Sequence, residues 1–177
     1  MTTSYLWVAG PSGAGKDTLL RLAAQQLQDD TRFHFVTRLV TRPQGAWKEK
    51  SLTVETLAAL ERAGELALRW QAHGWDYALP WLELQTAARL QVASVSRQVL
   101  PQVYAELGGE ILLIDAELEI RRQRLLARGR EAPAAVAVRL ERQVLLPAAL
   151  PYRCIRNDGA LADGVQSLLE RLQTLVS

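Results

Sequence analysis

The chain has 177 residues, a single cysteine, no long apolar run and almost no net charge. One cysteine, Cys154, excludes an internal disulfide and any zinc cluster built from cysteines, and we expect it to be a buried, apolar-like thiol. The net charge of +2 gives no indication of a nucleic-acid or membrane partner. Because 49% of the residues are hydrophobic and 23% are charged, the composition fits one globular domain with its own core.

The sequence also lacks the features of a membrane-spanning or exported protein. No apolar run approaches the ~20 residues needed to cross a bilayer. The first ten residues, MTTSYLWVAG, have neither a basic segment nor a signal-peptide cleavage site. We therefore expect a cytoplasmic protein, while the sequence does not indicate its oligomeric state.

Strand and helix patterns alternate along the chain, which predicts a mostly parallel sheet with helices on both faces. The expected strands are 5–9, 33–37, 91–96, 110–115 and 152–156, with two more over 66–80 that turn near Gly74. The expected helices with defined bounds are 17–28, 54–63, 80–90, 118–128, 133–143 and 161–176. One further helix is expected to begin near Pro101. Residues 41–51 contain Pro43 and Gly45 and are predicted to form a loop. The whole chain, 1–177, is expected to be one domain, in which about 38–80 is an insertion over the sheet.

The segment GPSGAGKDT, residues 10–18, is close to the phosphate-binding pattern G-x-x-x-x-G-K-[ST]. It follows an apolar strand and opens an amphipathic helix, as the mechanism of such a loop requires. Glycines let backbone N–H groups turn toward phosphate oxygens, and the helix N-terminus adds partial positive charge. Lys16 would supply a mobile cation for the β- and γ-phosphates. The predicted nucleotide-binding residues are Gly10, Pro11, Ser12, Gly13, Ala14, Gly15, Lys16, Asp17 and Thr18.

Asp17 occupies the position where the pattern has a hydroxyl, and Thr18 follows one place late. Mg²⁺ prefers oxygen ligands and often takes one or two carboxylates together with phosphate oxygens. Asp17 is therefore a candidate metal ligand; alternatively, it only favours the helix N-terminus and Thr18 meets the metal. A second acid often ends another strand of such proteins. Asp115 ends a strand but lies late in the chain, and the better-placed segment, 92–97, has no acid.

Phosphoryl transfer also needs positive charge around the phosphoryl oxygens and around a second anionic substrate. Gly129 separates Arg128 from Arg130 at a predicted helix end, as a closing lid over about 128–143 would require. The candidate arginines are Arg38, Arg42, Arg97, Arg124, Arg128, Arg130, Arg139 and Arg142.

Several segments resemble known kinases. GPSGAGK, VTRP (40–43) and RGRE (128–131) look like the guanylate kinase superfamily of three-layer P-loop proteins. Closer matches to the ribose 1,5-bisphosphate phosphokinase family are WQAHGWDY (70–77), SRQVLPQ (96–102), RGREAPAAVAVRLER (128–142) and NDGAL (157–161). This resemblance implies transfer of the ATP γ-phosphoryl group to ribose 1,5-bisphosphate, giving 5-phosphoribosyl 1-diphosphate in phosphonate breakdown.

The resemblance also implies roles for individual residues. ATP and Mg²⁺ would bind at the loop 10–18, Asn157 would lie near the adenine, and Lys16, Arg128 and Arg130 would be catalytic. The residues implied to face the sugar phosphate are Arg38, Arg42, His73, Tyr77, Arg97 and Arg139. Since a phosphate acceptor is already ionised, His73 is expected to donate hydrogen bonds or to pack rather than to act as a base. The expected partners are small molecules, with no nucleic acid and no membrane.

Four residues depart from the family pattern, all on the proposed acceptor side: Ser51, Ala78, Ser94 and Val95. Two other functions therefore stay open. One is a nucleoside monophosphate kinase close to guanylate kinase, and the other is a non-catalytic module with the same fold.

Overall fold

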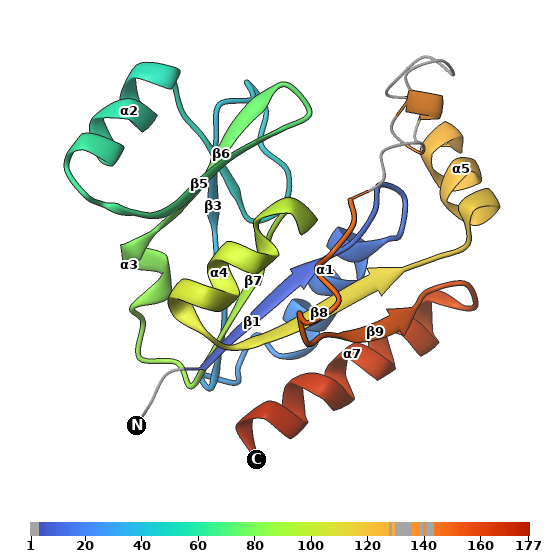
Figure 1. The fold of residues 1–177 in the computed structure, drawn as a ribbon. Coiled ribbons are helices and arrows are strands. Elements are labelled where there is room, and N and C mark those ends of the chain that lie inside the picture. Colours follow the sequence, from blue (N-terminus) through green and yellow to red (C-terminus); the bar gives the residue numbers. More distant parts are fainter. Residues whose placement is uncertain (1–3, 128, 130–135, 139, 141–143) are drawn as a thin grey trace.

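A five-stranded parallel sheet forms the centre of the molecule (Figure 1). This computed structural model describes residues 4–127, 129, 136–138, 140 and 144–177. The strand order is β2 (Phe33–Phe35), β7 (Leu90–Ser94), β1 (Ser4–Ala9), β8 (Glu110–Asp115), β9 (Arg153–Arg156), and every neighbouring pair is parallel. The segment that resembles a phosphate-binding loop follows the central strand, β1, at its carboxyl end.

The central sheet is covered on both faces, so the molecule has the three-layer α/β architecture that the sequence predicts. Alternate side chains of β1 point to opposite faces, and Leu6 and Trp7 accordingly belong to different apolar cores. On the side of Leu6 lie α1 (Lys16–Gln26) and α7 (Leu161–Val176). On the side of Trp7 lies α4 (Leu100–Leu107).

Between β2 and β7 the chain forms a second, mostly antiparallel sheet. Its strand order is β4 (Glu49–Ser51), β3 (Arg38–Val40), β6 (Trp75–Pro80), β5 (Leu66–Ala72), with β3 and β4 parallel. Helix α2 (Val54–Arg62) packs on this sheet through Leu57, which is fully buried. Thr53 caps α2, because its hydroxyl accepts the N–H of Thr56 at 3.2 Å.

The two sheets share one apolar core. Leu68 and Trp70 of β5 pack in the same cluster as Trp7 and Leu100. Three short elements complete the frame around this junction and the carboxyl end of the central sheet: α3 (Trp81–Leu84), the 3₁₀ turn η1 (Arg97–Val99) and α5 (Leu118–Ala127). The second sheet is thus fixed against the central one beside the carboxyl end of β1.

Two predicted elements are wrong in extent. The helix expected over 80–90 ends at Leu84, and Leu90 instead begins β7, where it pairs with Ser4 and with Phe33. The expected loop 41–51 ends in the short strand β4, whose pairing with β3 has no counterpart in the local sequence pattern. In both cases pairing with distant strands overrides local preference.

Cys154 is exposed, so the expectation of a buried thiol is wrong. It lies on β9, which ends the sheet and pairs with β8 alone. The sheet edge leaves most side chains of this strand open to solvent.

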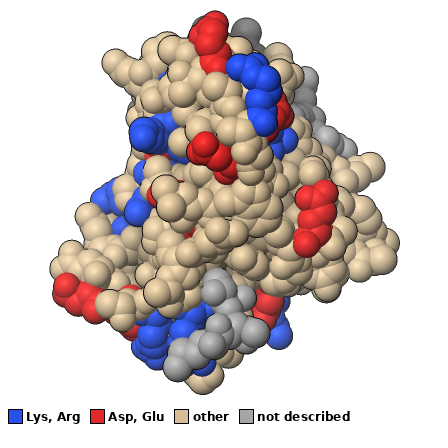
Figure 2. Space-filling view, turned by 90° about the vertical axis from the view of Figure 1, so that its left-hand side faces the viewer, with Lys and Arg blue, Asp and Glu red and all other residues tan. Residues whose placement is uncertain are grey.

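Arg128, Arg130, Arg139 and Arg142 lie outside the described residues, as does most of the predicted lid. Within the part of the chain that the structure describes, no helix is both long and apolar enough to span a membrane. On the face shown in Figure 2, the visible acidic and basic side chains are scattered singly or in small groups among uncharged ones.

Candidate active site

The phosphate-binding loop joins β1 to α1 in a conformation that requires glycine. At Gly10 an added Cβ would lie 2.1 Å from the carbonyl oxygen of Ile114 on β8, so the loop leaves the sheet in direct contact with its neighbour. Gly15 has a φ of 88° and ends the loop at the first turn of α1, where its carbonyl accepts the N–H of Leu19. The loop therefore places the N-terminus of α1 at the cavity described below.

Three side chains donate hydrogen bonds to carbonyl groups of this loop. Asn157 donates through Nδ2 to the Ala14 carbonyl at 2.8 Å, and Arg124 donates to the same oxygen at 3.4 Å. Arg121 donates through Nε to the Ser12 carbonyl at 3.1 Å. These bonds fix the conformation of the loop, and backbone N–H groups of a loop of this kind can bind an anion.

Two residues that the sequence singles out contact the loop itself. Asn157 is 2% exposed and is not among the described residues that line the cavity, and its amide supports the loop. Its place near the adenine stays a prediction. Arg124, a candidate for phosphate charge, likewise binds a loop carbonyl. Arg121 had no sequence signal for this role beyond its place in an arginine-rich helix.

Replacing Asn157 by alanine is expected to lower the free energy of unfolding by about 1–3 kcal/mol, because the buried Ala14 carbonyl loses its nearer donor. A looser loop should also weaken ATP and GTP binding to a similar degree. Urea unfolding and equilibrium nucleotide binding measure both effects. The control is Gln166→Ala, which removes only an exposed side-chain bond to Glu170 on α7. Unchanged stability with an altered preference between ATP and GTP would instead support a contact with the base.

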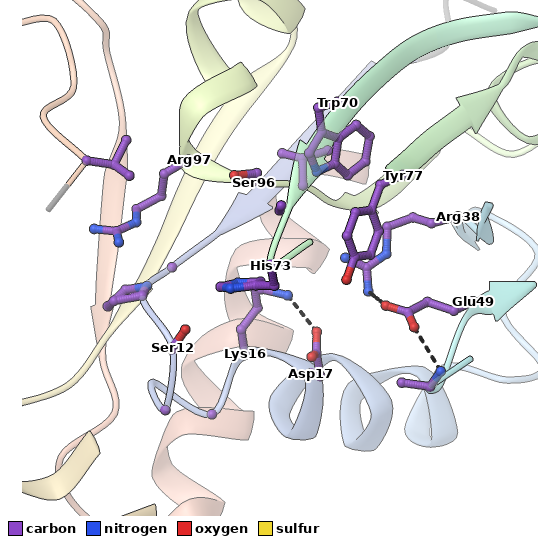
Figure 3. Close-up of a pocket in the computed structure, with 18 of the residues that line it drawn as sticks. Ser12, Lys16, Asp17, Arg38, Glu49, Trp70, His73, Tyr77, Ser96 and Arg97 are labelled. Atoms are coloured by element: carbon purple, nitrogen blue, oxygen red, sulfur yellow. Dashed lines mark hydrogen bonds and ion pairs between the residues drawn. The ribbon is translucent and has the colours of Figure 1, made fainter. Parts of the chain in front are cut away.

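The side chain of Lys16 lies between two oxygen atoms at the mouth of the loop. Its Nζ is 2.5 Å from Oδ1 of Asp17 (Figure 3). It also contacts Oγ of Ser94 at the end of β7. Burial lowers the pKa of Lys16, and the neighbouring Asp17 carboxylate partly offsets this shift. The cation is thus held at the loop with little contact with water.

The carboxylate of Asp17, beside Lys16, can ligate a metal ion that is also bound by nucleotide phosphates. Asp17 lines the cavity with a half-exposed carboxylate, whereas Thr18 is not among the described lining residues. The described residues contain no group of three or more His, Cys, Asp or Glu side chains that could hold a metal. Since Mg²⁺ often takes one or two carboxylates and completes its shell with water and phosphate, Asp17 suits this mode of binding.

Across a cavity of about 270 Å³, β3 and the connection that follows it present two arginines, Arg38 and Arg42, which are joined by one carboxylate. Glu49 accepts from Nη2 of Arg38 at 2.7 Å through Oε1 (Figure 3). Through Oε2 it accepts from Arg42 and from the N–H of Ala46. Arg42 also donates through Nε to the carbonyl of Gln44 at 2.8 Å. This wall carries fixed positive charge opposite the phosphate-binding loop.

Aromatic rings support Arg38 from the side. The Arg38 guanidinium lies 5.9 Å from the centre of the Tyr77 ring, and Tyr77 stacks on Trp70 at 5.6 Å. Burial raises the pKa of Tyr77, and the Glu49 carboxylate raises it further. The phenol therefore stays protonated and can donate a hydrogen bond to an anion.

His73 reaches the cavity from the turn between β5 and β6. Ala72 pairs with Trp75, so His73 and Gly74 form a two-residue hairpin turn, and both have positive φ values, 54° and 78°. Such a turn matches the strand twist but is uncommon for a residue with a side chain. It places the imidazole among the lining residues together with Lys16 (Figure 3).

The cavity brings together most of the described residues that the sequence singles out. These lining residues are Gly10, Pro11, Ser12, Gly13, Gly15, Lys16, Asp17, Arg38, Arg42, His73, Tyr77 and Arg97. Ala14, Thr18 and Asn157 are not among them, and Arg128, Arg130 and Arg139 lie outside the described residues.

The predicted site residues do not include Glu49 or Trp70, and Ser94 is noted in the sequence only as a departure from the family pattern. The signals for Glu49 are that it is an acid seven residues after Arg42 in a polar segment and that Glu49-Lys50-Ser51 stands where the family resemblance implies an E-x-H segment. Ser94 could have been noticed because it ends the strand beside β1, at the edge where the loop begins. With both walls in place, the cavity can hold two anionic groups that face each other.

Comparison with known proteins identifies the family. No protein-family model matches the chain. The ribose 1,5-bisphosphate phosphokinase PhnN of Brucella melitensis is 41% identical over 145 residues, covering 79% of this chain and 76% of the relative. The protein of the same name from Methylobacterium radiotolerans is 40% identical over 172 residues, covering 94% and 95%.

A similar solved structure is guanylate kinase from Anaplasma phagocytophilum. It has a TM-score of 0.65 and 15% sequence identity, covering 97% of this chain and 85% of that chain, and at this identity it supports the fold alone. The sequence relatives go further, because their identity extends over most of the chain. The chain belongs to the ribose 1,5-bisphosphate phosphokinase family and is a nucleotide-binding P-loop kinase.

Proposed function

We propose that the protein transfers the γ-phosphoryl group of ATP to the 1-phosphate of ribose 1,5-bisphosphate, as the names of its relatives indicate. An oxygen of the 1-phosphate attacks the γ-phosphorus, and the bond from that phosphorus to the β–γ bridging oxygen breaks. The products are 5-phosphoribosyl 1-diphosphate and ADP. The observation that carries the proposal is the cavity with a phosphate-binding loop on one wall and Arg38 with Arg42 on the other.

On the donor side, the loop N–H groups and Lys16 would bind the phosphates of ATP. Asp17 would hold Mg²⁺, or Thr18 would do so, and the ion would neutralise charge on the phosphates. Arg128 and Arg130 would close over the transferring group, a role that rests on the family resemblance alone. Lys16 then stabilises negative charge that shifts toward the leaving oxygen.

On the acceptor side, Arg38, Arg42 and Arg97 would bind the sugar phosphates. Bidentate contacts from arginine favour ligands that carry terminal phosphate groups. Tyr77 and His73 would donate hydrogen bonds, and Arg139 is included by resemblance. Because the attacking phosphate oxygen is already ionised, no side chain is required as a general base.

The purified protein is expected to convert ribose 1,5-bisphosphate into 5-phosphoribosyl 1-diphosphate when both ATP and Mg²⁺ are present. Mass spectrometry and ³¹P NMR follow the product, and GMP serves as the competing acceptor. Fast turnover of GMP with none of the bisphosphate would overturn this assignment. ATP binding without turnover of either acceptor would favour a non-catalytic module.

The geometry of Glu49 argues against the guanylate kinase alternative. Guanine recognition needs acceptors for its ring and exocyclic N–H groups. Glu49 is the only acid in the segment 44–51, and both of its oxygens already accept hydrogen bonds from arginines. We place the reaction in the cytoplasm, in the breakdown of phosphonates.

A further inference from the structure

We propose that Glu49 is a positioning residue, which sets the orientation of Arg38 and Arg42 and thereby the affinity for the acceptor phosphate. This inference rests on the proposed function, because it concerns the same acceptor wall. Glu49 itself is not expected to contact the reacting atoms.

The backbone brings the three side chains together before any ligand binds. Arg38 and Glu49 are register partners on the parallel strands β3 and β4, so their side chains leave neighbouring positions on the sheet. The side chain of Glu49 is only 5% exposed. Its two oxygens bind Arg38, Arg42 and the backbone N–H of Ala46, so the carboxylate is fixed at three points.

A carboxylate fixed in this way can hold two cations close together. Two guanidinium groups repel each other, and the buried negative charge between them offsets this repulsion. Each arginine has five N–H donors, so the contact with Glu49 leaves further donors on both. Within the described part of the chain, Nε of Arg38 is buried and has no hydrogen-bond partner. Arginines oriented beforehand lose less side-chain entropy when a phosphate binds.

If Glu49 had a different role, its removal would change acceptor binding in the opposite direction. If Glu49 only occupied the place of the acceptor phosphate, or only reduced the positive charge of the wall, its removal would strengthen acceptor binding. If Glu49 positions the arginines, its removal weakens acceptor binding although the net positive charge increases. The direction of the change in KM therefore separates the two roles.

Two substitutions separate the effect of the negative charge of Glu49 from the effect of its side-chain length. Glu49→Gln keeps the length but has one acceptor oxygen and an NH₂ donor, so it cannot accept from both arginines and from Ala46. Glu49→Asp keeps the charge but is one methylene shorter and cannot span the same three donors. Both variants are expected to raise the KM for ribose 1,5-bisphosphate by about tenfold, with smaller changes in kcat and in the KM for ATP.

The matched control is Glu61→Gln, which breaks an ion pair with Arg69 beside the same sheet, away from the cavity. It should leave all kinetic constants unchanged. Thermal unfolding reports whether each variant is folded, and if Glu49→Gln does not fold, the KM of Glu49→Asp decides. An unchanged or lower acceptor KM in the folded variants overturns the positioning role. A wild-type protein that does not phosphorylate the bisphosphate overturns the proposed function instead; equilibrium binding of the bisphosphate to wild type and Glu49→Asp then still tests the role of Glu49.

Discussion

Replacing Lys16 by methionine is expected to lower kcat by on the order of 100- to 1,000-fold, because a fixed donor to the transferring phosphoryl group is lost. Methionine keeps the length and apolar body of the side chain without the ammonium. Steady-state and single-turnover kinetics measure the effect. The control is Lys50→Met on β4, which removes an exposed lysine that does not line the cavity. A Lys16→Met variant that keeps more than about a tenth of wild-type kcat would contradict the role assigned to Lys16.

The same variant should lose a distinctive dependence of stability on pH. Burial lowers the pKa of Lys16 in the folded protein below its ordinary value of 10.5. Between the two pKa values the unfolded chain binds more protons, so the stability contribution of this group increases as the pH rises through that window. Lys16→Met lacks the group, and its stability relative to wild type should therefore be greatest at lower pH. Urea unfolding across the alkaline range tests the sign.

Replacing Asp17 by asparagine is expected to weaken the apparent affinity for Mg²⁺ at saturating ATP by at least about tenfold, because a charged metal ligand is lost. Titration of Mn²⁺ into the complex with ATP gives a readout that does not depend on turnover. Because the carboxylate also raises the pKa of Lys16, its removal should lower that pKa further. ATP binding should then weaken at a lower pH than in wild type.

The control for Asp17 is Asp163→Asn, which changes an acidic residue in the first turn of α7 in the same way. It isolates the general effect of a carboxylate at a helix N-terminus. If Asp17→Asn behaves like this control while Thr18→Val loses the metal dependence, the ligand is Thr18 and Asp17 only favours the start of α1.

The sequence predicts the frame of the fold well where one local pattern determines an element. The apolar run EILLID gives β8, Glu110–Asp115, because both faces of the central sheet are buried. The closing helix, α7, has apolar residues at helical spacing along its whole length and is likewise predicted at its observed bounds. These elements need no information about distant segments.

The acceptor wall is harder to predict because its parts lie apart in the sequence and meet through strand pairing. Tyr77 and Trp70 stack only because β5 and β6 pair in the observed register. Glu49 meets Arg38 only because β4, a polar strand of three residues, joins β3. The phosphate-binding loop, by contrast, is a continuous segment whose spacing is visible directly. Donor-side residues were therefore found from a motif, and acceptor-side residues mainly from a family resemblance.

The connection between β2 and β7 has a consequence for how substrate choice can change. These two strands are neighbours in the central sheet, yet the whole second sheet lies between them in the sequence. One continuous exchange of residues 38–80 would thus replace Arg38, Arg42, Glu49, His73 and Tyr77 and leave the phosphate-binding loop and Arg97 untouched. Such a graft would have to preserve the apolar side chains that face Trp7, since Leu68 and Trp70 complete its core. The fold therefore allows the acceptor-binding region to change as a unit, provided that its apolar side chains still fit the core that it shares with the central sheet.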